Sequence, residues 1–227
     1  MYQNRFFLIL LIFILTASII KAQPEFRVDS NEDYQTLING RIWRKKQPGI
    51  SGDPFLFSNR YLDGSVSIGK TTFTSLKLRY DIFTDEIMIP HDSIVLQLNK
   101  ERVDSFSVLW ENRKIRFLRI PHTSLYPFSG YVRNVYTGKS SLYIKYQKKI
   151  DHPGIVNVPD NFYQIQEIYF LKDGIAYKVN NRKELLRILK NDRAEISAFL
   201  KENKVHMRRN DPEGFIPVLR FYDQIRL

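Results

Sequence analysis

Residues 61–98, YLDGSVSIGKTTFTSLKLRYDIFTDEIMIPHDSIVLQL, decide the fold. Within this stretch Leu76, Leu78 and Tyr80 alternate with Lys77 and Arg79. An alternation of apolar and charged residues with a period of two is typical of a strand with one buried face. We therefore predict antiparallel strands at residues 73–82, 86–89 and 93–98, the first two joined by a turn at residues 84–86.

Strands of the same kind are predicted before and after this stretch. Pro90 is expected to end the strand at 86–89, because proline has no backbone N–H to give to a sheet. The further strands are at 41–44, 103–110, 114–120, 131–136, 141–150, 166–171 and 175–179, and residues 23–40 show only weak patterning. Strands about ten residues apart with polar turns are typical of a sheet that curls or stacks.

The opening stretch also matches the phosphate-binding pattern G-x-x-x-x-G-K-[ST], from Gly64 to Thr71. That chemistry needs a buried strand before the first glycine and a helix after the lysine, because the N-terminal N–H groups of the helix bind the phosphates. The preceding sequence, NRYLD, is not a buried strand, and the following sequence has the alternation of a strand. We predict a hairpin with turns at residues 63–64 and 69–70, and a nucleotide site is the alternative.

The pattern changes to a helical one after residue 179. Leu185, Leu186 and Leu189 recur at helical spacing, with Asn180 or Asn181 as N-cap. A second helix is predicted from Asp192 to Asn203, and a third near Ile216 because Pro217 suits only a first turn. The fold class is therefore mainly β (α+β): an antiparallel meander forming a curved sheet or barrel-like domain, capped by two or three C-terminal helices. The divisions are a signal peptide at 1–22, a β domain at 23–179 and a helical cap at 180–227.

The N-terminus has the features of an export signal. Arg5 precedes an apolar run at residues 6–20, and Ala22 is a small residue suited to cleavage. The run is shorter than the ~20 apolar residues that span a bilayer, although an uncleaved anchor is the alternative. The chain has no cysteine, which excludes lipid attachment through cysteine, disulfides, thiol catalysis and cysteine-based zinc sites. The expected location is the bacterial periplasm or the outside of the cell.

Cleavage would leave 33 basic and 24 acidic residues, a net charge of +9. This charge permits binding to anionic lipid headgroups, polysaccharides or nucleic acid. The basic residues are scattered along the sequence, however, without an arginine-rich arm or a recognition helix. Most are expected to cover solvated faces. An anionic envelope surface or a protein partner therefore fits the charge, nucleic acid is not expected, and no transmembrane span is expected after cleavage.

Few residues suggest chemistry. His91 and Asp92 follow Asp85 and Glu86, so these four residues could form a metal cluster, and the carboxylates could form an acid–base pair. No H-x-x-x-H, H-E-x-x-H or G-x-S-x-G spacing supports a preformed site, and turn polarity explains the four residues. We therefore predict no catalytic, cofactor-binding or metal residue and no cofactor. The 13 Tyr and 16 Phe could stack ligands or fill the core of the sheet, and the core is the better explanation.

The chain resembles a group of uncharacterised exported bacterial proteins. These proteins share a Y-x-G-x-x-x-L-Y strand pair, a "yyl-kdg-y-v" hairpin and a helical tail with a tyrosine pair, which is Phe221-Tyr222 here. The matching segments cover about the last two-fifths of the chain and residues 78–87: GYVRNVYTGKSSLYIKYQKK, IYFLKDGIAYKVNNRKELLRIL, RAEISAFLKENKV, LRFYDQI and LRYDIFTDEI. The resemblance implies export and the fold, and it implies no activity.

These observations favour an exported envelope or secreted protein with a non-enzymatic binding or structural role. The alternative is a periplasmic carrier that holds a lipid or another lipophilic ligand within the curved sheet, which would require a continuous apolar cavity. An enzyme would require Asp85, Glu86, His91 and Asp92 to converge in one pocket.

Overall fold

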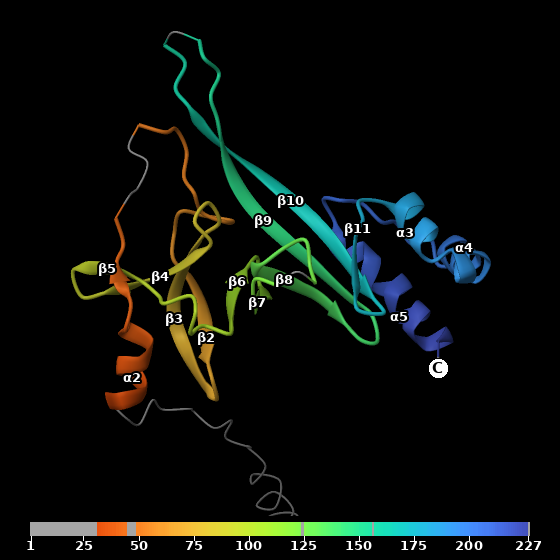
Figure 1. Cartoon of the computed structure of the whole chain (residues 1–227), viewed down its shortest axis with the longest axis horizontal. Helices are drawn as coiled ribbons and strands as arrows, with labels where there is room; N and C mark the ends of the chain where they lie inside the picture. The colour runs from red at the N-terminus through yellow and green to blue at the C-terminus, as the bar shows by residue number, and fades with distance from the viewer. Residues whose placement is uncertain (1–30, 45–48, 124, 156, 227) are drawn as a thin grey trace, which may run out of the picture.

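The computed structural model describes residues 31–44, 49–123, 125–155 and 157–226, with the backbone alone for residues 31–34. The predicted signal segment at residues 1–22 lies outside the described residues. One antiparallel sheet dominates the molecule, with helix α2 (Asn31–Ile38) at one end and the C-terminal helices at the other (Figure 1).

The sheet has eleven strands in the order β1-β5-β4-β3-β2-β6-β7-β8-β9-β10-β11. Every pairing between these strands is antiparallel, and β1 and β11 are not paired with each other. The sheet is therefore open. We predicted either a curved sheet or a barrel-like domain, and the structure does not close into a barrel. The strands are β1 (Arg41–Ile42), β2 (Leu62–Ile68), β3 (Thr71–Asp81), β4 (Glu86–His91), β5 (Ile94–Gln97), β6 (Ser105–Trp110), β7 (Arg113–Ile120), β8 (Gly130–Thr137), β9 (Ser141–Asp151), β10 (Asn161–Lys172) and β11 (Ile175–Lys178).

Tight turns set the register of the hairpins. Glu111 and Asn112 both have positive φ, as do Asp173 and Gly174. Each pair is the two-residue loop of a hairpin, β6–β7 and β10–β11 respectively. Two consecutive positive φ values are the backbone of a type I′ turn, whose twist matches that of the flanking strands. The meander predicted from the sequence is thus confirmed at these positions.

Four local predictions were wrong. Residues 63–64 form no turn but lie within β2, because β2 pairs with both β3 and β6 there. Pro90 does not end β4: it pairs with Val95 of β5, beyond the last residue of β4 that pairs with β3, where a missing N–H is tolerated. Strand β10 starts five residues earlier than expected, at Asn161, and α2 occupies a segment for which no helix was predicted.

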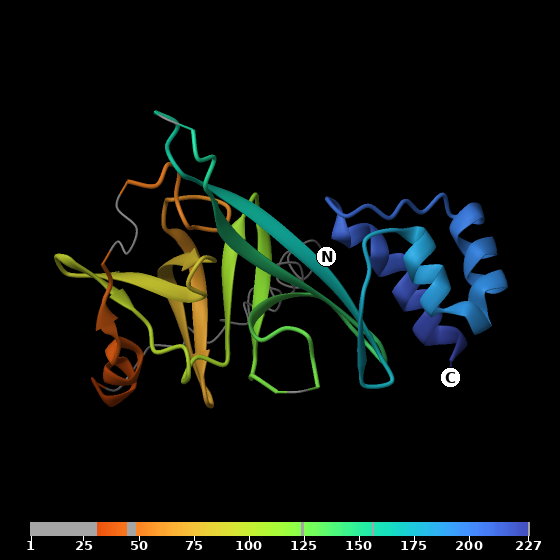
Figure 2. The same ribbon diagram turned by 45° about the horizontal axis from the view of Figure 1, so that its top comes forward.

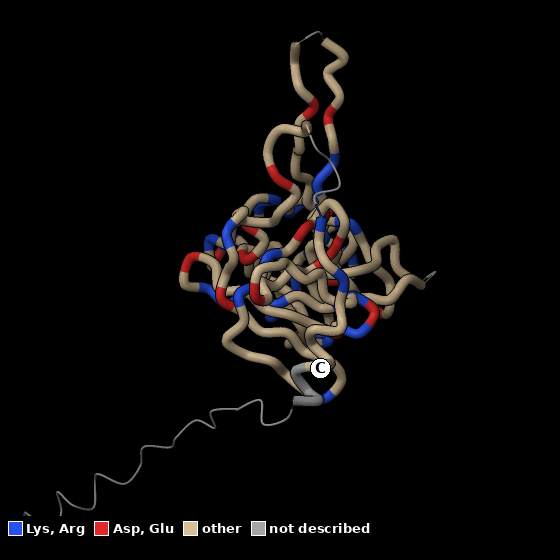
Figure 3. Tube along the Cα trace, turned by 90° about the vertical axis from the view of Figure 1, so that its left-hand side faces the viewer, with Lys and Arg blue, Asp and Glu red and all other residues tan. Residues whose placement is uncertain are grey.

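The long strands β9 and β10 pair over their whole length and project as an arm beyond the rest of the sheet (Figure 3). The first five residues of β10, residues 161–165, are half-buried or exposed and none is fully buried, and they pair with the last residues of β9. Neither face of this part of β10 is fully buried, so it lacks the regular alternation of apolar and polar residues by which strands are predicted from sequence.

Aromatic side chains fill the interior of the sheet. The rings of Phe106 and Phe117 are stacked with centroids 4.6 Å apart, and Tyr80 meets both rings edge-on. These geometries are the favoured ones for aromatic pairs. A cavity beside Leu78, Val108 and Phe117 has a volume of about 10 Å³. This cavity is close to the minimum that one water needs.

The C-terminal cap contains α3 (Arg182–Ile188), α4 (Arg193–Glu202) and α5 (Ile216–Ile225), with short 3₁₀ turns at Lys190–Asp192 and Pro212–Phe215. The three helices lie together at the end of the molecule that carries β11 (Figure 2). Tyr222 of α5 packs edge-on against Phe170 of β10, and the buried apolar residues of all three helices belong to the main core. The predicted helical cap is confirmed.

Candidate anion-binding groove

The nucleotide-binding pattern from Gly64 to Thr71 forms a hairpin. It runs along β2, turns at Gly69 and Lys70, and enters β3, so no helix follows the lysine. Gly64 is needed for a packing reason, since a Cβ there would lie 2.2 Å from the carbonyl oxygen of Ser107 on β6. The geometry that would cradle a phosphate is absent from this hairpin.

Asp85 belongs to a buried polar cluster in the turn before β4. Its Oδ1 accepts hydrogen bonds from the Tyr80 hydroxyl at 2.5 Å and from the Lys145 ammonium at 3.0 Å, and its Oδ2 accepts one from the Tyr131 backbone N–H. Burial raises the pKa of Tyr80 well above its ordinary value, and the Asp85 charge raises it further. The three donors around the Asp85 carboxylate, from Tyr80, Lys145 and Tyr131, all bond to it within the fold. This arrangement indicates a structural role for Asp85.

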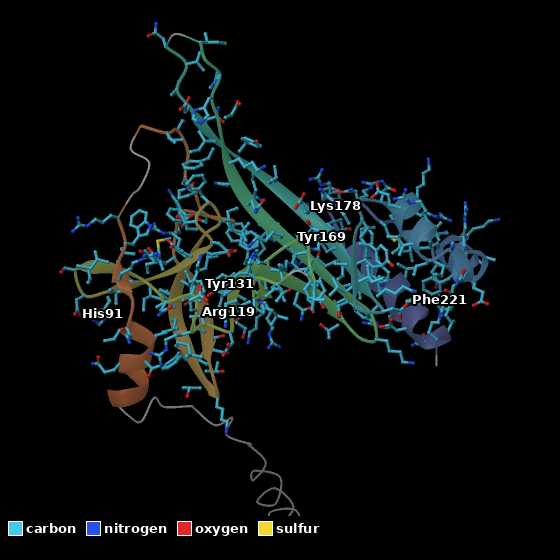
Figure 4. All side chains as sticks on the ribbon, viewed as in Figure 1. His91, Arg119, Tyr131, Tyr169, Lys178 and Phe221 are labelled. Atoms are coloured by element: carbon cyan, nitrogen blue, oxygen red, sulfur yellow. The ribbon has the colours of Figure 1, made fainter. Side chains whose placement is uncertain are left out.

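The other three residues of the proposed acidic cluster do not converge with Asp85. Glu86 accepts a hydrogen bond from Arg41 at 2.8 Å. His91 and Asp92 lie at the far end of β4, where His91 Nε2 is 3.7 Å from Asp92 Oδ2. Glu86 and His91 are five positions apart along β4, which corresponds to roughly 17 Å. Figure 4 places His91 at the β5 end of the molecule, away from Tyr131. Among the described residues, no group of three His, Asp or Glu side chains could hold a metal ion.

A groove on the C-terminal cap is the strongest candidate for a functional site. It has a volume of about 720 Å³ and lies along α3 and the start of α4. We call it the basic groove, and its lining residues are Arg182, Lys183, Leu186, Arg187, Lys190, Arg193 and Ser197. Five of these seven residues are cationic and none is acidic, so the groove favours a negatively charged ligand.

The start of α3 is fixed by its capping interactions. The Asn181 side-chain oxygen accepts a hydrogen bond from the Glu184 backbone N–H, and the Glu184 carboxylate accepts one from the Asn180 backbone N–H at 2.8 Å. This reciprocal arrangement is a variant of the capping box, in which the Glu184 carboxylate reaches the backbone N–H of the residue before the N-cap. Glu184 is the acidic residue of α3. Because its carboxylate is hydrogen-bonded at the start of the helix, it does not pair with the cations of the groove.

The remaining acidic residues of the cap are also engaged or lie elsewhere. Asp192 accepts a hydrogen bond from Arg226 at 2.7 Å, and Glu213 is paired with Arg133 of β8. Glu195 and Glu202 lie on α4, but at 100° per residue they face roughly the opposite side of the helix from Arg193. Within the described part of the chain, none of the side chains of the five groove cations forms an ion pair or a hydrogen bond.

The cationic surface continues beside the groove. A second depression of about 490 Å³ shares Arg182 with the groove and adds Lys204, His206 and Arg208. Residues 180–209 contain nine Lys and Arg against four Asp and Glu, a net charge of +5. Elsewhere, the buried Lys145 is paired with Asp85 and the part-buried Lys148 with Asp53. The cap thus presents unpaired cations around two adjoining depressions.

Sequence reasoning missed this grouping. Lys183 and Arg187 were treated as scattered surface charges, and the other three groove cations were not singled out. A usable signal was present, because residues 183, 187, 190 and 193 are spaced by four, three and three, which places side chains along one side of a helix. The sequence predicts the second helix, from Asp192 to Asn203, but it could not show that this helix folds beside the first.

Comparisons of this chain with models of protein families, with curated proteins and with solved structures find no match. Among the described helices, none combines the length and the apolar character needed to cross a membrane.

Proposed function

We propose that this protein is an exported, non-enzymatic binding protein of the periplasm or the cell exterior, and that it recognises an anionic partner through the basic groove. The observation that carries the proposal is the set of five exposed cations around one groove without an acidic residue in its lining. Because unpaired cations repel one another, a surface of this kind gains most from an anionic partner.

The positions of the other candidate residues support a non-enzymatic role. Asp85 in the turn before β4 and Glu86 and His91 at the two ends of β4 are engaged in separate interactions. The alternative role as a lipid carrier has less support, because the cavity of about 10 Å³ in the sheet interior is far smaller than the ~300 Å³ or more of a typical ligand site. Export and membership in the exported bacterial group stay predictions.

A titration with soluble poly-L-glutamate tests the groove. The variant carries Lys183→Gln, Arg187→Gln and Lys190→Gln, and the matched control carries Arg113→Gln, Lys114→Gln and Arg116→Gln at exposed positions of β7. Both variants lose three charges. We expect the groove variant to bind about tenfold more weakly, since an exposed ion pair contributes about 0.5 kcal/mol, and the control to retain most of the affinity. Equal losses in the two variants would show that net charge alone governs binding.

A further inference from the structure

We propose that the basic groove docks onto the surface of a bilayer that contains anionic phospholipid. This inference rests on the proposed function and names its partner. A membrane, a polysaccharide, a nucleic acid and an acidic protein all carry negative charge, so the choice among them depends on the shape and composition of the cationic surface.

The exposure of the cations favours a diffuse anionic surface over a small anion. Arg182, Lys183, Arg187, Lys190 and Arg193 are all exposed, and no polar side chain of the groove is buried. A specific pocket for one phosphate or carboxylate would hold fixed, desolvated donors. Long, solvated Lys and Arg side chains are instead suited to a surface with many mobile negative charges.

The lining of the groove disfavours nucleic acid and sugar. Single-stranded nucleic acids bind on aromatic side chains that stack against the bases. No aromatic residue lines the basic groove, and Phe199 of α4 stacks on Phe221 of α5 with ring centroids 4.3 Å apart. Leu186 is the apolar residue of the lining. It lies about 60° from Lys183 around α3, so the two residues are on the same side of the helix.

The position of the groove allows a planar surface to approach it. Helices α3 and α4 lie at the end of the molecule opposite α2, and the β9–β10 arm projects from the body in another direction (Figures 1 and 2). The adjoining Lys204 and Arg208 extend the cationic area at this end. Clusters of four to eight Lys and Arg on helices are the pattern by which proteins bind anionic lipid surfaces.

Flotation of the full chain with vesicles tests the inference. The vesicles contain either phosphatidylcholine alone or equal parts of phosphatidylglycerol and phosphatidylcholine. We expect tight binding to the anionic vesicles only. Any insertion of the apolar N-terminal segment would occur with both kinds of vesicle, so the difference between them reports the charges. Each cation near an anionic surface contributes about fivefold in affinity, so the Lys183→Gln, Arg187→Gln, Lys190→Gln variant should bind about 100-fold more weakly.

The matched control variant on β7 decides whether the groove itself is responsible. The control should keep binding to anionic vesicles, and the unfolding midpoints of both variants should equal that of the unaltered chain. Equal binding to both vesicle types, or equal losses in the two variants, would overturn the membrane inference. Binding of poly-L-glutamate without binding of anionic vesicles would overturn it too, while leaving the proposed function intact. If the chain bound neither poly-L-glutamate nor anionic vesicles, both the proposed function and the membrane inference would be refuted.

Discussion

Replacement of Asp223 by alanine should weaken the attachment of the C-terminal cap to the sheet. Asp223 lies on α5 and is 9% exposed. Its carboxylate accepts hydrogen bonds from the Ser140 backbone N–H at 3.0 Å, the Ser140 hydroxyl at 2.7 Å and the Tyr136 hydroxyl at 2.8 Å. These three donors belong to the end of β8 and the β8–β9 turn, so one side chain joins the last helix to two central strands.

The cost follows from the number and type of these bonds. A hydrogen bond to a charged acceptor contributes about 1.5–3 kcal/mol, and a buried donor left without a partner costs about 1–3 kcal/mol. The losses do not add fully, since water can enter the space left by the carboxylate. We therefore expect Asp223→Ala to lower the free energy of unfolding by about 3–5 kcal/mol. That is a large share of the ~5–15 kcal/mol that stabilises a typical domain.

Equilibrium unfolding in urea measures this cost, with Glu195→Ala on the exposed side of α4 as control. A double-mutant cycle with Tyr136→Phe should give a coupling energy of about 1–2 kcal/mol. Gly138→Ala approaches the same contact from the other side, because a Cβ there would lie 2.2 Å from Asp223 Oδ2. Its cost should shrink in the Asp223→Ala background. A loss below about 0.5 kcal/mol for Asp223→Ala would refute the reasoning, since exposed surface residues give such values.

The pKa of Tyr136 gives an independent readout of the same contact. Burial and, after it, the hydrogen bond to Asp223 raise the pKa of Tyr136 to about 12. In Asp223→Ala the second cause is removed, so the pKa should move back toward its ordinary value of 10.0. A difference titration of tyrosine absorbance between the two proteins measures the shift.

Three further predictions concern the sheet. Lys145→Met should destabilise the fold by about 3–5 kcal/mol in urea unfolding, because the Lys145 side chain is 7% exposed and its loss leaves the part-buried Asp85 without its cation. Gly64→Ala should cost more than about 2 kcal/mol in the same assay, because the atom that a Cβ would meet is the Ser107 backbone oxygen, which cannot rotate away. Burial raises the pKa of Asp81 above 3.8, so the native state binds this proton more tightly than the unfolded state does. The unaltered chain should therefore gain stability as the pH falls through the folded pKa of Asp81, and Asp81→Asn should lack that gain when unfolding is measured across pH values just above 3.8.

The sequence predicts the strands that lie over the core and misses the elements that lie beyond it. Strand β3 has one buried face, so its alternation is visible in the residues themselves. The outer half of β10 has no such face, and its pairing with β9 depends on the neighbouring strand. The turn expected at residues 63–64 failed for a related reason. Gly64 usually signals a turn, whereas here it permits the close approach of β6, a strand about 40 residues further along the chain.

The candidate site was less predictable than the fold. A basic residue on a predicted helix is usually a solvated surface charge. What distinguishes Lys183 and Arg187 is that the acidic residues of the cap either have other partners or face away from the groove, and two of those partners are distant in the sequence. Asp192 forms an ion pair with Arg226, and Glu213 forms one with Arg133 on β8. No sequence spacing shows such pairings, so the unpaired cations become evident only in the folded chain.

The attachment of the cap and the charge of the groove should be separable. Asp223 acts on the buried side of α5, where it contacts the sheet, whereas the groove cations are exposed side chains on α3 and at the start of α4. The connection between the two regions is the packing of α4 on α5, including the stacked rings of Phe199 and Phe221. Asp223→Ala should therefore lower the unfolding free energy while leaving binding to anionic vesicles unchanged under conditions where the variant is folded. Removal of the groove cations should do the reverse, because exposed charges contribute little to folding and much to the attraction of an anionic surface. A loss of binding in folded Asp223→Ala would mean that the orientation of the cap on the sheet, and not its charge alone, positions the groove.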